Sequence, residues 1–143
     1  MKPAPDYVPA HGLLRGKSVL VTAAAGAGIG FAVAKRAAEE GCRALYISDV
    51  HERRLNEAVK AIQAETGLQE VYGLLCDVSQ EAQVQALIDD AEARMGGIDV
   101  LINNAGLGTS KRIVDMDDDE WNKVIGVTLT GTFRVTRAAL RVM

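Results

Sequence analysis

The chain alternates four times between a short apolar run and a longer segment with the periodicity of a helix. The runs are too short for helices, and they are apolar nearly throughout instead of alternating with polar residues. Such runs are typical of parallel strands that are covered on both faces. We therefore expect an α/β fold, a doubly wound parallel sheet of about four strands with helices on both faces. The expected strands cover about residues 17–23, 43–48, 70–76 and 98–106.

Apolar residues at helical spacing predict the segments between these strands. In the first helix, Ile29, Val33, Ala37 and Ala38 share one side and are expected to face the sheet. Ser79 is expected to cap the third helix. Four acidic residues at 117–120 place negative charge at the positive end of a last helix, which is expected to run from about residue 117 to the last residue. The expected helices cover about residues 28–41, 51–67, 79–97 and 117–143.

The composition predicts one folded unit. The 143 residues have room for a single core, and 48% of them are hydrophobic. Residues 1–16 hold all three prolines without apolar periodicity, so we expect a flexible arm there and one domain over 17–143. The last helix carries no Gly or Pro stop signal, which predicts that the doubly wound sheet is incomplete.

Charge and cysteine content argue against several classes of protein. The formal net charge is −3 and no basic stretch is longer than a pair, so we expect neither a nucleic-acid nor a membrane partner. Because no signal peptide or membrane span is predicted, a cytoplasmic location is expected. Cys42 and Cys76 are isolated and the chain has only two histidines, so we expect reduced thiols and no metal site.

The loop between the first expected strand and the first expected helix is rich in glycine. It runs from Thr22 to Gly30 and includes Gly26 and Gly28. Glycines let a backbone approach a pyrophosphate, and a helix N-terminus offers free N–H groups and a positive dipole. The alternative is that the small residues only let the helix and strand pack closely. The strand before the loop and the helix after it favour nucleotide binding.

An acidic residue, Asp49, follows the second expected strand. Its distance from Gly30 is close to the spacing of about 20 residues at which a carboxylate meets the adenosine ribose hydroxyls of a dinucleotide. The alternative is a cap for the helix that begins near His51. A carboxylate here repels a 2′-phosphate, so NAD is expected over NADP, although Arg53 and Arg54 could reach such a phosphate.

Two further strand ends carry polar side chains. Asp77, before Val78, could accept a hydrogen bond from an adenine or cap the next helix. The fourth strand lies beside the first in a doubly wound order, so its amides are expected across from the glycine loop. There they could serve a ligand or the backbone of neighbouring strands. That strand ends in Asn103, Asn104, Ala105 and Gly106.

With these features in order, the chain resembles the short-chain dehydrogenase/reductase family over residues 13–143. The resemblance also covers the segment WNKVIGVTLTGTF at 121–133. It implies a Rossmann-type, NAD(P)-dependent oxidoreductase that acts on hydroxyl and keto groups, usually as a dimer or tetramer joined partly through the last helix. The segments VTAAAGAGIG, NNAGLG and DMDDDEWNKV resemble an actinobacterial branch. That branch includes hydroxyacyl-CoA dehydrogenases of steroid-ring breakdown and 3-oxoacyl reductase-like proteins.

The resemblance implies roles for individual residues. Asp49 would contact the ribose, Asp77 and Val78 the adenine, and the block 104–106 the middle of the cofactor. Within that block the residues are Asn104, Ala105 and Gly106. The residues implied for the loop and the pyrophosphate side are Thr22, Gly26, Gly28, Ile29 and Gly30.

The chain departs from the family at two positions that concern the site. Ala23 follows Thr22 where the family usually has Gly, and the loop is one residue longer with Gly26 added. Thr128 stands where the family has an Asn that organises a catalytic water chain. Thr128 is therefore the candidate catalytic residue, with its hydroxyl as the group that could hold a water.

The family's catalytic Ser and its Tyr-x-x-x-Lys pair lie beyond the last helix. None of the three tyrosines of the chain, Tyr7, Tyr46 and Tyr72, is followed by Lys four residues later. We therefore expect the cofactor-binding part of an oxidoreductase that moves hydride between NAD and a small hydroxyl or keto substrate, with acyl-CoA as one substrate class. These 143 residues alone are expected to be inactive. The alternatives are a non-catalytic dinucleotide-binding module and, with less support, an S-adenosylmethionine methyltransferase.

Overall fold

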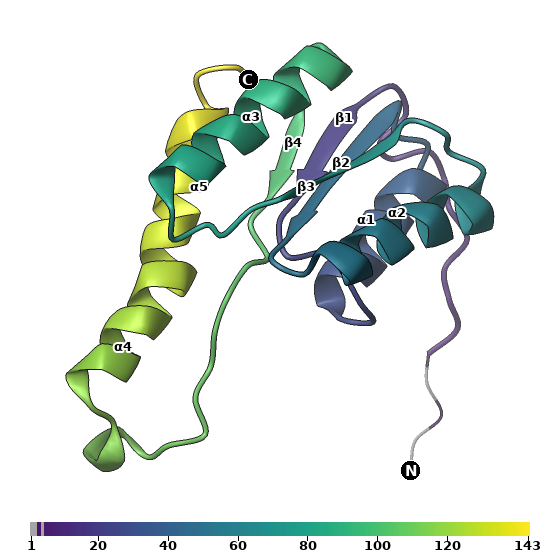
Figure 1. Cartoon of the computed structure of the whole chain (residues 1–143). Helices are drawn as coiled ribbons and strands as arrows, with labels where there is room; N and C mark the ends of the chain where they lie inside the picture. The colour runs from purple at the N-terminus through teal and green to yellow at the C-terminus, as the bar shows by residue number, and fades with distance from the viewer. Residues whose placement is uncertain (1–2, 4) are drawn as a thin grey trace.

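Four parallel strands form one sheet in the order β3-β2-β1-β4 (Figure 1). The computed structural model describes residue 3 and residues 5–143. Because β1 lies between β2 and β4, the sheet has the doubly wound order that the sequence predicted, and the α/β fold class is confirmed. The strands are β1 Ser18–Val21, β2 Ala44–Asp49, β3 Val71–Leu75 and β4 Val100–Ile102.

Helices cover both faces of this sheet. α1 and α2 lie on one face, and α3 and α5 pack together on the other (Figure 1). A 3-10 turn, Ile113–Asp115, precedes α4. The helices are α1 Ile29–Glu39, α2 Glu52–Thr66, α3 Glu81–Met95, α4 Asp118–Ile125 and α5 Thr132–Ala139.

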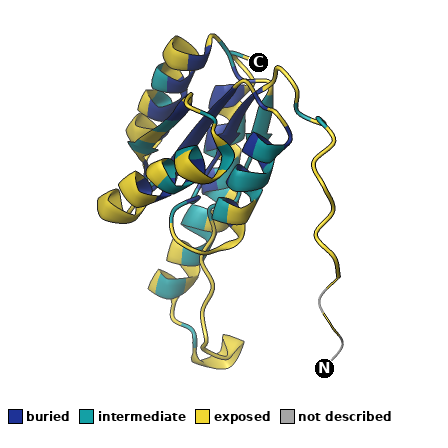
Figure 2. Cartoon of the chain, turned by 90° about the vertical axis from the view of Figure 1, so that its right-hand side faces the viewer, coloured by how far each residue is buried: buried dark blue, intermediate teal, exposed yellow. Residues whose placement is uncertain are grey.

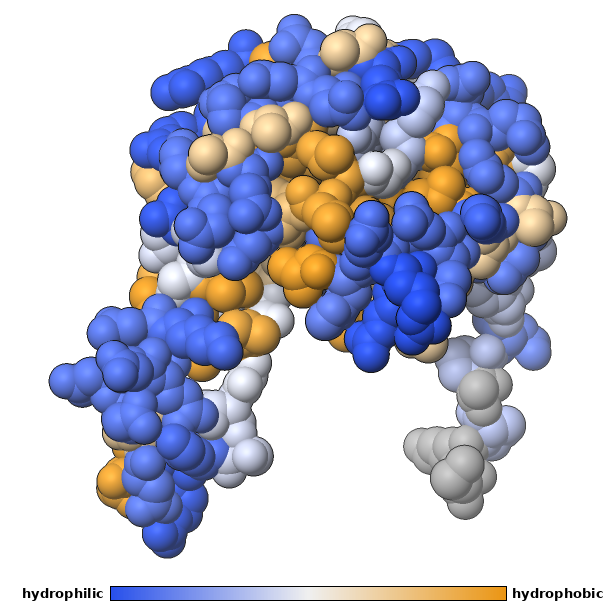
Figure 3. All heavy atoms as spheres, viewed as in Figure 1, coloured by the Kyte–Doolittle hydropathy of each residue, from blue (hydrophilic) through white to orange (hydrophobic). Residues whose placement is uncertain are grey.

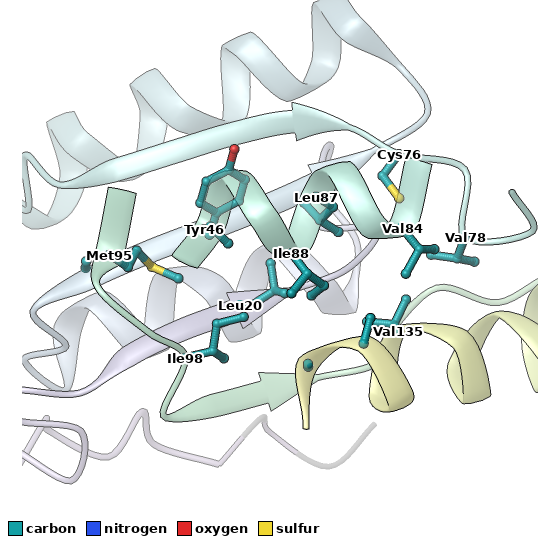
Figure 4. Packing of buried hydrophobic residues seen from close by; sticks show 14 residues of the cluster. Leu20, Tyr46, Cys76, Val78, Val84, Leu87, Ile88, Met95, Ile98 and Val135 are labelled. Carbon is teal, nitrogen blue, oxygen red and sulfur yellow. The ribbon is translucent and has the colours of Figure 1, made fainter. Parts of the chain in front are cut away.

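The side chains of the central strands alternate between two cores. Leu20 of β1 and Tyr46 of β2 point toward α3 and α5, where Ile88 and Val135 complete the cluster (Figure 4). Since both faces are covered, β1 and β2 are buried along their whole length (Figure 2). This double burial is the reason why their sequences are apolar without alternation. The residues that face α1 and α2 are Val19, Val21, Leu45 and Ile47.

The two edge strands are less buried than the central pair. Along β3 the burial alternates, and Leu75 is 42% exposed. Figure 3 shows apolar atoms in the middle of this face, over β3 between α2 and α3. All three residues of β4 are half-buried. The expectation of strands apolar nearly throughout because both faces are covered therefore fits β1 and β2 better than the edges.

The first helix turns a different side to the sheet than its apolar spacing predicted. Ile29 is 78% exposed and Val33 is half-buried, whereas Gly30 and Ala34 are buried with Ala37 and Ala38. A Cβ atom at Gly30 would lie 2.5 Å from the carbonyl oxygen of Ala23, so only glycine allows the helix to approach this closely. The expectation that Ile29 faces the sheet was wrong because the smallest side chains, and not the largest, set the contact.

The last helix changes its geometry in the middle. A π-helical segment, Gly126–Gly131, joins α4 to α5 without interrupting the helical backbone. At Gly131 a Cβ atom would lie 2.5 Å from Cγ2 of Val78, so the backbone of this segment packs directly on the loop between β3 and α3. A π-helical turn is wider than an α-helical one and is often found at functional sites. The helix expected from about 117 is therefore present over residues 118–139 with a π-helical stretch in its middle, and it ends four residues before the last residue.

The predicted cap of the third helix was also wrong. α3 begins after Gln80, which makes no side-chain capping bond. Ser79 lies one residue earlier, and its backbone N–H donates to Oδ1 of Asp77 at 2.9 Å. The Asp77 side chain therefore holds the turn before α3, which leaves Ser79 outside the capping position.

Residues 5–12 form no helix or strand and run past α1 before the chain enters β1 (Figure 1). Over the described part of the chain, no helix is both long enough and apolar enough to cross a bilayer.

Candidate functional site

The loops that follow β1, β2, β3 and β4 gather at one edge of the sheet. Parallel strands present their carboxyl ends at the same edge, and ligands of open α/β sheets bind there. Hydrogen bonds join these segments directly: Asn104 after β4 bonds to Thr22 after β1, and Ala25 in the first loop bonds to Asp49, the last residue of β2. The predicted residues of the glycine loop, Asp49 and the 103–106 block therefore lie together.

The glycine loop leaves the N-terminus of α1 open. Gly28 is the N-cap residue, no described side chain caps this end, and the first turn carries no acidic residue. Gly26 has a φ of +85°, which favours glycine, and a Cβ atom at Gly26 or Gly28 would meet nothing within 4 Å. Unpaired N–H groups and the positive end of the dipole therefore face open space. The packing role suggested as the alternative holds for Gly30 and not for Gly26 or Gly28.

Asp49 presents a largely buried carboxylate beside this loop. It is 8% exposed. Its Oδ2 accepts the N–H of Ala25 and its Oδ1 accepts the N–H of His51, both at 3.1 Å. The N-cap of α2 is His51, so Asp49 supports the turn before the helix without capping it. A carboxylate has about four acceptor positions, so two backbone bonds leave room for ligand hydroxyls.

The two arginines of α2, Arg53 and Arg54, are exposed to solvent. Arg53 forms an exposed ion pair with Glu57 at 2.9 Å, and its side chain is 80% exposed. Arg54 is also exposed. This arrangement is the solvated helix face that arginines commonly form.

Asp77 and Val78 follow β3 and differ in their surroundings. Asp77 is half-buried; its Oδ1 accepts from Ser79, and its own N–H donates to Oε1 of Gln83 at 2.8 Å. Val78 is 5% exposed and lies against Gly131 of the π-helical segment. Asp77 therefore holds a turn, and one of its oxygens has no partner among the described residues.

Thr22 and Asn104 tie β1 to β4 at the centre of the site. The Thr22 hydroxyl accepts the N–H groups of Asn104 and Ala105, both at 3.0 Å. The Asn104 amide donates to the carbonyl oxygens of Thr22 at 3.1 Å and Ala23 at 2.9 Å. Asn103 instead donates to Thr136 of α5 at 2.9 Å. Both amides thus have structural roles, as the sequence allowed.

Thr128 lies in the π-helical segment and reaches the loop after β4. Its Oγ1 accepts the N–H of Leu107 at 3.0 Å and donates to the carbonyl oxygen of Leu107 at 3.2 Å. Gly106 lies beside Thr128, since a Cβ atom at Gly106 would be 3.7 Å from Oγ1 of Thr128. The structure therefore brings Thr128 to the site, where its hydroxyl is engaged with the backbone.

One polar group at this edge was missed by the sequence interpretation. Ser48, the residue before Asp49, is fully buried, and its hydroxyl has no hydrogen-bond partner among the described residues. A buried hydroxyl without a partner is unusual in folded proteins. The signal that could have found it is a serine inside an otherwise apolar strand, RALYIS. The open helix N-terminus and the acidic acceptor together suit a dinucleotide with its phosphates and hydroxyls.

Other titratable groups near the sheet are not suited to catalysis. Burial and the hydrogen bond to Asp90 raise the pKa of Tyr46, so this phenol stays protonated. Burial raises the pKa of the Cys76 thiol to about 11, so it is not a nucleophile at neutral pH. Among the residues that the structure describes, no three metal-ligating side chains gather into a possible metal site.

Comparison with known proteins identifies the family. A family model described as short chain dehydrogenase matches residues 17–143. The chain belongs to the short chain dehydrogenase family, as its resemblance implied.

Two curated relatives indicate the range of the family around this chain. The "(5R,7aS)-5-hydroxy-7a-methyl-1-oxo-2,3,5,6,7,7a-hexahydro-1H-indene-carboxyl-CoA reductase" of Mycobacterium tuberculosis is 56% identical over 138 residues, which are 96% of this chain and 52% of that protein. The 3beta-hydroxysteroid dehydrogenase of Mediterraneibacter gnavus is 38% identical over 89% of this chain and 45% of that protein. The chain thus spans about half the length of the curated relatives it matches.

Solved structures agree with the fold. A short chain dehydrogenase from Mycobacterium smegmatis superposes with a TM-score of 0.92 at 51% identity, over 98% of this chain and 57% of that chain. An actinorhodin polyketide ketoreductase, solved with NADPH, superposes with a TM-score of 0.81 at 34% identity, over 89% of this chain and 47% of that chain. The Rossmann-type architecture and the likeness to actinobacterial CoA-linked reductases are confirmed.

Proposed function

We propose that the chain is the cofactor-binding part of an oxidoreductase that transfers hydride between NAD(H) and a hydroxyl or keto substrate. The observation that carries this proposal is the uncapped N-terminus of α1, held next to the Asp49 carboxylate by the hydrogen bond from Ala25. The helix N-terminus attracts phosphate, and the Asp49 carboxylate accepts hydrogen bonds from hydroxyl groups. A dinucleotide carries phosphates and ribose hydroxyls at adjoining positions.

Each part of the cofactor has a partner in this proposal. The N–H groups from Gly26 to Gly30 bind the pyrophosphate, and Asp49 accepts the ribose hydroxyls. Asp77, through its free oxygen, and Val78 contact the adenine. Ala105 and Gly106 border the middle of the cofactor, in a position fixed by the bonds between Asn104 and Thr22. When bound, the nicotinamide would accept or donate the hydride, and these residues would bind and orient the cofactor.

NAD is favoured over NADP by the charge beside the ribose. The Asp49 carboxylate repels a 2′-phosphate, and Arg53 is engaged by Glu57 on the solvent side of α2. The relative solved with NADPH shows that members of the family use the phosphorylated cofactor as well. The preference for NAD in this chain therefore rests on Asp49.

The substrate class is proposed from the relatives. The relative from Mycobacterium tuberculosis is named as a reductase of a carboxyl-CoA compound, and the one from Mediterraneibacter gnavus as a hydroxysteroid dehydrogenase. We propose a small hydroxyl or keto substrate, with a CoA-linked ring compound as the first choice. Thr128 would hold the Leu107 loop at the entrance for this substrate and bind a water with its remaining lone pair.

Turnover is proposed to need groups outside these 143 residues. The family's base is a tyrosine four residues before a lysine, and Tyr7, Tyr46 and Tyr72 are not followed by such a lysine. Three apolar residues along the last helix are exposed: Trp121 of α4 by 49%, Leu129 of the π-helical segment by 63% and Phe133 of α5 by 56%. Their exposure supports a homo-oligomer, a dimer or tetramer, joined through this face. A cytoplasmic location is proposed from the two buried, unbridged cysteines.

Titrations of the purified protein with NAD, NADP and S-adenosylmethionine test the proposal. We expect binding of NAD in preference to NADP, and no tight binding of S-adenosylmethionine. In Asp49→Ala the preference for NAD over NADP is expected to fall by about tenfold, because a charged hydrogen-bond acceptor and a repulsive charge are both removed.

Asp89→Ala is the matched control, since Asp89 lies on the exposed side of α3 and bonds only to Gln85. It is expected to leave the ratio of the two affinities unchanged. An unchanged ratio in Asp49→Ala would show that the NAD assignment is wrong. Binding of S-adenosylmethionine without NAD would favour a methyltransferase, and NADH production by this chain alone would contradict the proposed inactivity.

A further inference from the structure

The N-terminal arm lies outside the part of the chain that matches the family model, which begins at residue 17. It nevertheless has a defined set of partners. Tyr7, Val8 and Pro9 contact the last turn of α1, and His11 and Leu13 contact the residue that follows its end. All of these contacts are made by three neighbouring charged residues, Arg36, Glu39 and Glu40.

Glu40 is the centre of this contact. Its side chain is only 3% exposed. Its Oε2 accepts the backbone N–H groups of His11 at 3.0 Å and Leu13 at 2.9 Å. Its Oε1 lies 3.1 Å from Nδ1 of His11 and accepts from Nη2 of Arg36 at 2.5 Å. A buried carboxylate is stable only with such a full set of donors, and most of the donors here belong to the arm.

Arg36 binds the preceding part of the arm through its carbonyl groups. Its Nη1 donates to the carbonyl oxygen of Val8 at 2.6 Å, and its Nη2 to that of Pro9 at 3.3 Å. The guanidinium lies 5.1 Å from the centre of the Tyr7 ring, and the Tyr7 hydroxyl donates to Glu39 at 2.5 Å. Arg36 and Glu40 thus recognise an acceptor segment and a donor segment of one extended peptide.

The geometry of Gly12 explains how two N–H groups reach one oxygen. Gly12 has a φ of +81° and lies between His11 and Leu13. A left-handed residue between two others turns successive N–H groups to the same side and forms a small concave site for an anion. The Glu40 carboxylate occupies that position, which an extended peptide without this turn could not offer.

We propose that Arg36 and Glu40 form a receptor for an extended peptide on the outer side of α1, and that its occupant is the segment 7–13 of the same chain. Four of the five bonds that these two side chains make to the arm go to main-chain groups. The docked arm also forms one side of an apolar hollow of about 1170 Å³ whose other side includes Ile29 and Ile102. The arm therefore lies across α1 and is held there by hydrogen bonds to the charged side chains Arg36 and Glu40. The first turn of the same helix belongs to the proposed cofactor site.

Amide hydrogen exchange in the full chain tests the proposal. The N–H groups of His11 and Leu13 donate to Glu40 alone, so they are expected to exchange at least about tenfold more slowly than in a free peptide of residues 5–13. In Glu40→Gln this protection is expected to fall by about tenfold. Glu57→Gln is the matched control, because Arg53 and Glu57 form the same kind of pair on α2 without a docked segment, and it is expected to change nothing.

A second variant keeps the test independent of the folding of Glu40→Gln. His11→Pro removes both the backbone N–H and the imidazole that contact Glu40, and it leaves α1 untouched. Exchange at Leu13 is then expected to accelerate while the amides of β2 remain protected. The proposal is overturned if the wild type shows no protection at His11 and Leu13, or if neither variant changes it. Protection that rises with protein concentration would place a second copy's arm in the receptor and would also overturn it.

Discussion

Ala23 has the least favourable backbone conformation in the site. Among the described residues it is the one non-glycine residue with a positive φ, at +52°. The carbonyl oxygen of Ala23 accepts from the Asn104 amide at 2.9 Å, so a tertiary bond holds the loop in this conformation. The resemblance to the family explains the position, since the family usually has Gly after the loop threonine. The strain is therefore confined to Ala23, and the hydrogen bond from Asn104 keeps the loop in its conformation.

Ala23→Gly is expected to stabilise the protein. A left-handed conformation costs an L-residue about 1–2 kcal/mol, and the greater freedom of glycine in the unfolded chain offsets part of the gain, so an increase of about 1 kcal/mol in the free energy of unfolding is expected. Urea denaturation measures it as a higher midpoint at constant slope. Ala27→Gly, at a position without positive φ, is expected to lower the midpoint or leave it unchanged. A lower midpoint in Ala23→Gly would contradict the assignment of strain.

At the scale of elements, the π-helical segment Gly126–Gly131 decides how the last helix meets the sheet. Gly131 lets its backbone approach Val78, where a Cβ atom would lie 2.5 Å from Cγ2. At the other end of the segment, a Cβ atom on Gly126 would meet nothing within 4 Å. The wide turn between them presents Thr128 to the loop after β4. The packing of one glycine therefore places the candidate catalytic residue.

Alanine substitutions at the two ends of this segment are expected to have opposite effects. Gly131→Ala forces a methyl group into Val78 and is expected to lower the free energy of unfolding by about 1–3 kcal/mol. Gly126→Ala removes only backbone freedom and is expected to raise it by about 0.5–1 kcal/mol. Thermal or urea denaturation of both variants checks the pair. Equal effects at the two positions would show that the contact between Gly131 and Val78 is unimportant.

At the scale of the whole molecule, Glu40 links the arm to the domain in a pH-dependent way. The backbone hydrogen bonds from Leu13 and His11, together with the side-chain hydrogen bond from Arg36, lower the pKa of Glu40 from 4.5 to about 2. A carboxyl with a lowered pKa stabilises the folded state fully above its unfolded pKa and loses this effect as the pH falls through the folded value. The contribution of Glu40 is therefore present above about pH 4.5 and lost on the way to pH 2.

The difference in stability between the wild type and Glu40→Gln is expected to shrink as the pH falls from 5 toward 2, about the window set by the two pKa values. Urea denaturation at several pH values measures this difference. Glu57→Gln, in an exposed pair, is expected to show a difference from the wild type that is small at every pH. A constant difference between the wild type and Glu40→Gln would contradict the lowered pKa.

The apolar face of α4, α5 and the segment between them is expected to make the chain self-associate. Leu129 and Phe133 expose 63% and 56% of their surface on neighbouring turns, and contiguous exposed apolar patches commonly mark interfaces. Sedimentation velocity at increasing concentration is expected to show species larger than 15.2 kDa. Phe133→Asp is expected to shift them toward the monomer, whereas Val50→Asp, at an exposed residue after β2, is not. A monodisperse wild-type monomer would refute this expectation.

The sequence by itself determined the order of strands and helices and the positions of most polar groups of the site. Local periodicity suffices for the order of elements, because β1 and β2 need apolar residues on both faces. The polar residues of the site come directly at the ends of these apolar runs in the sequence, so locating a strand also locates them. Asp49 and the 103–106 block could be predicted to share the edge with the glycine loop since parallel strands align their carboxyl ends.

Only the tertiary structure decided which groups at the carboxyl edge of the sheet contact other parts of the chain. The outward side of Ile29 follows from the close approach of Gly30 to Ala23, and the π-helical stretch of the last helix ends at the contact of Gly131 with Val78. The docking of the arm on Glu40 is likewise invisible in a periodic pattern. These features depend on contacts between segments far apart in the chain, whose energies exist only once the segments have packed, whereas periodicity records only the average environment of each segment.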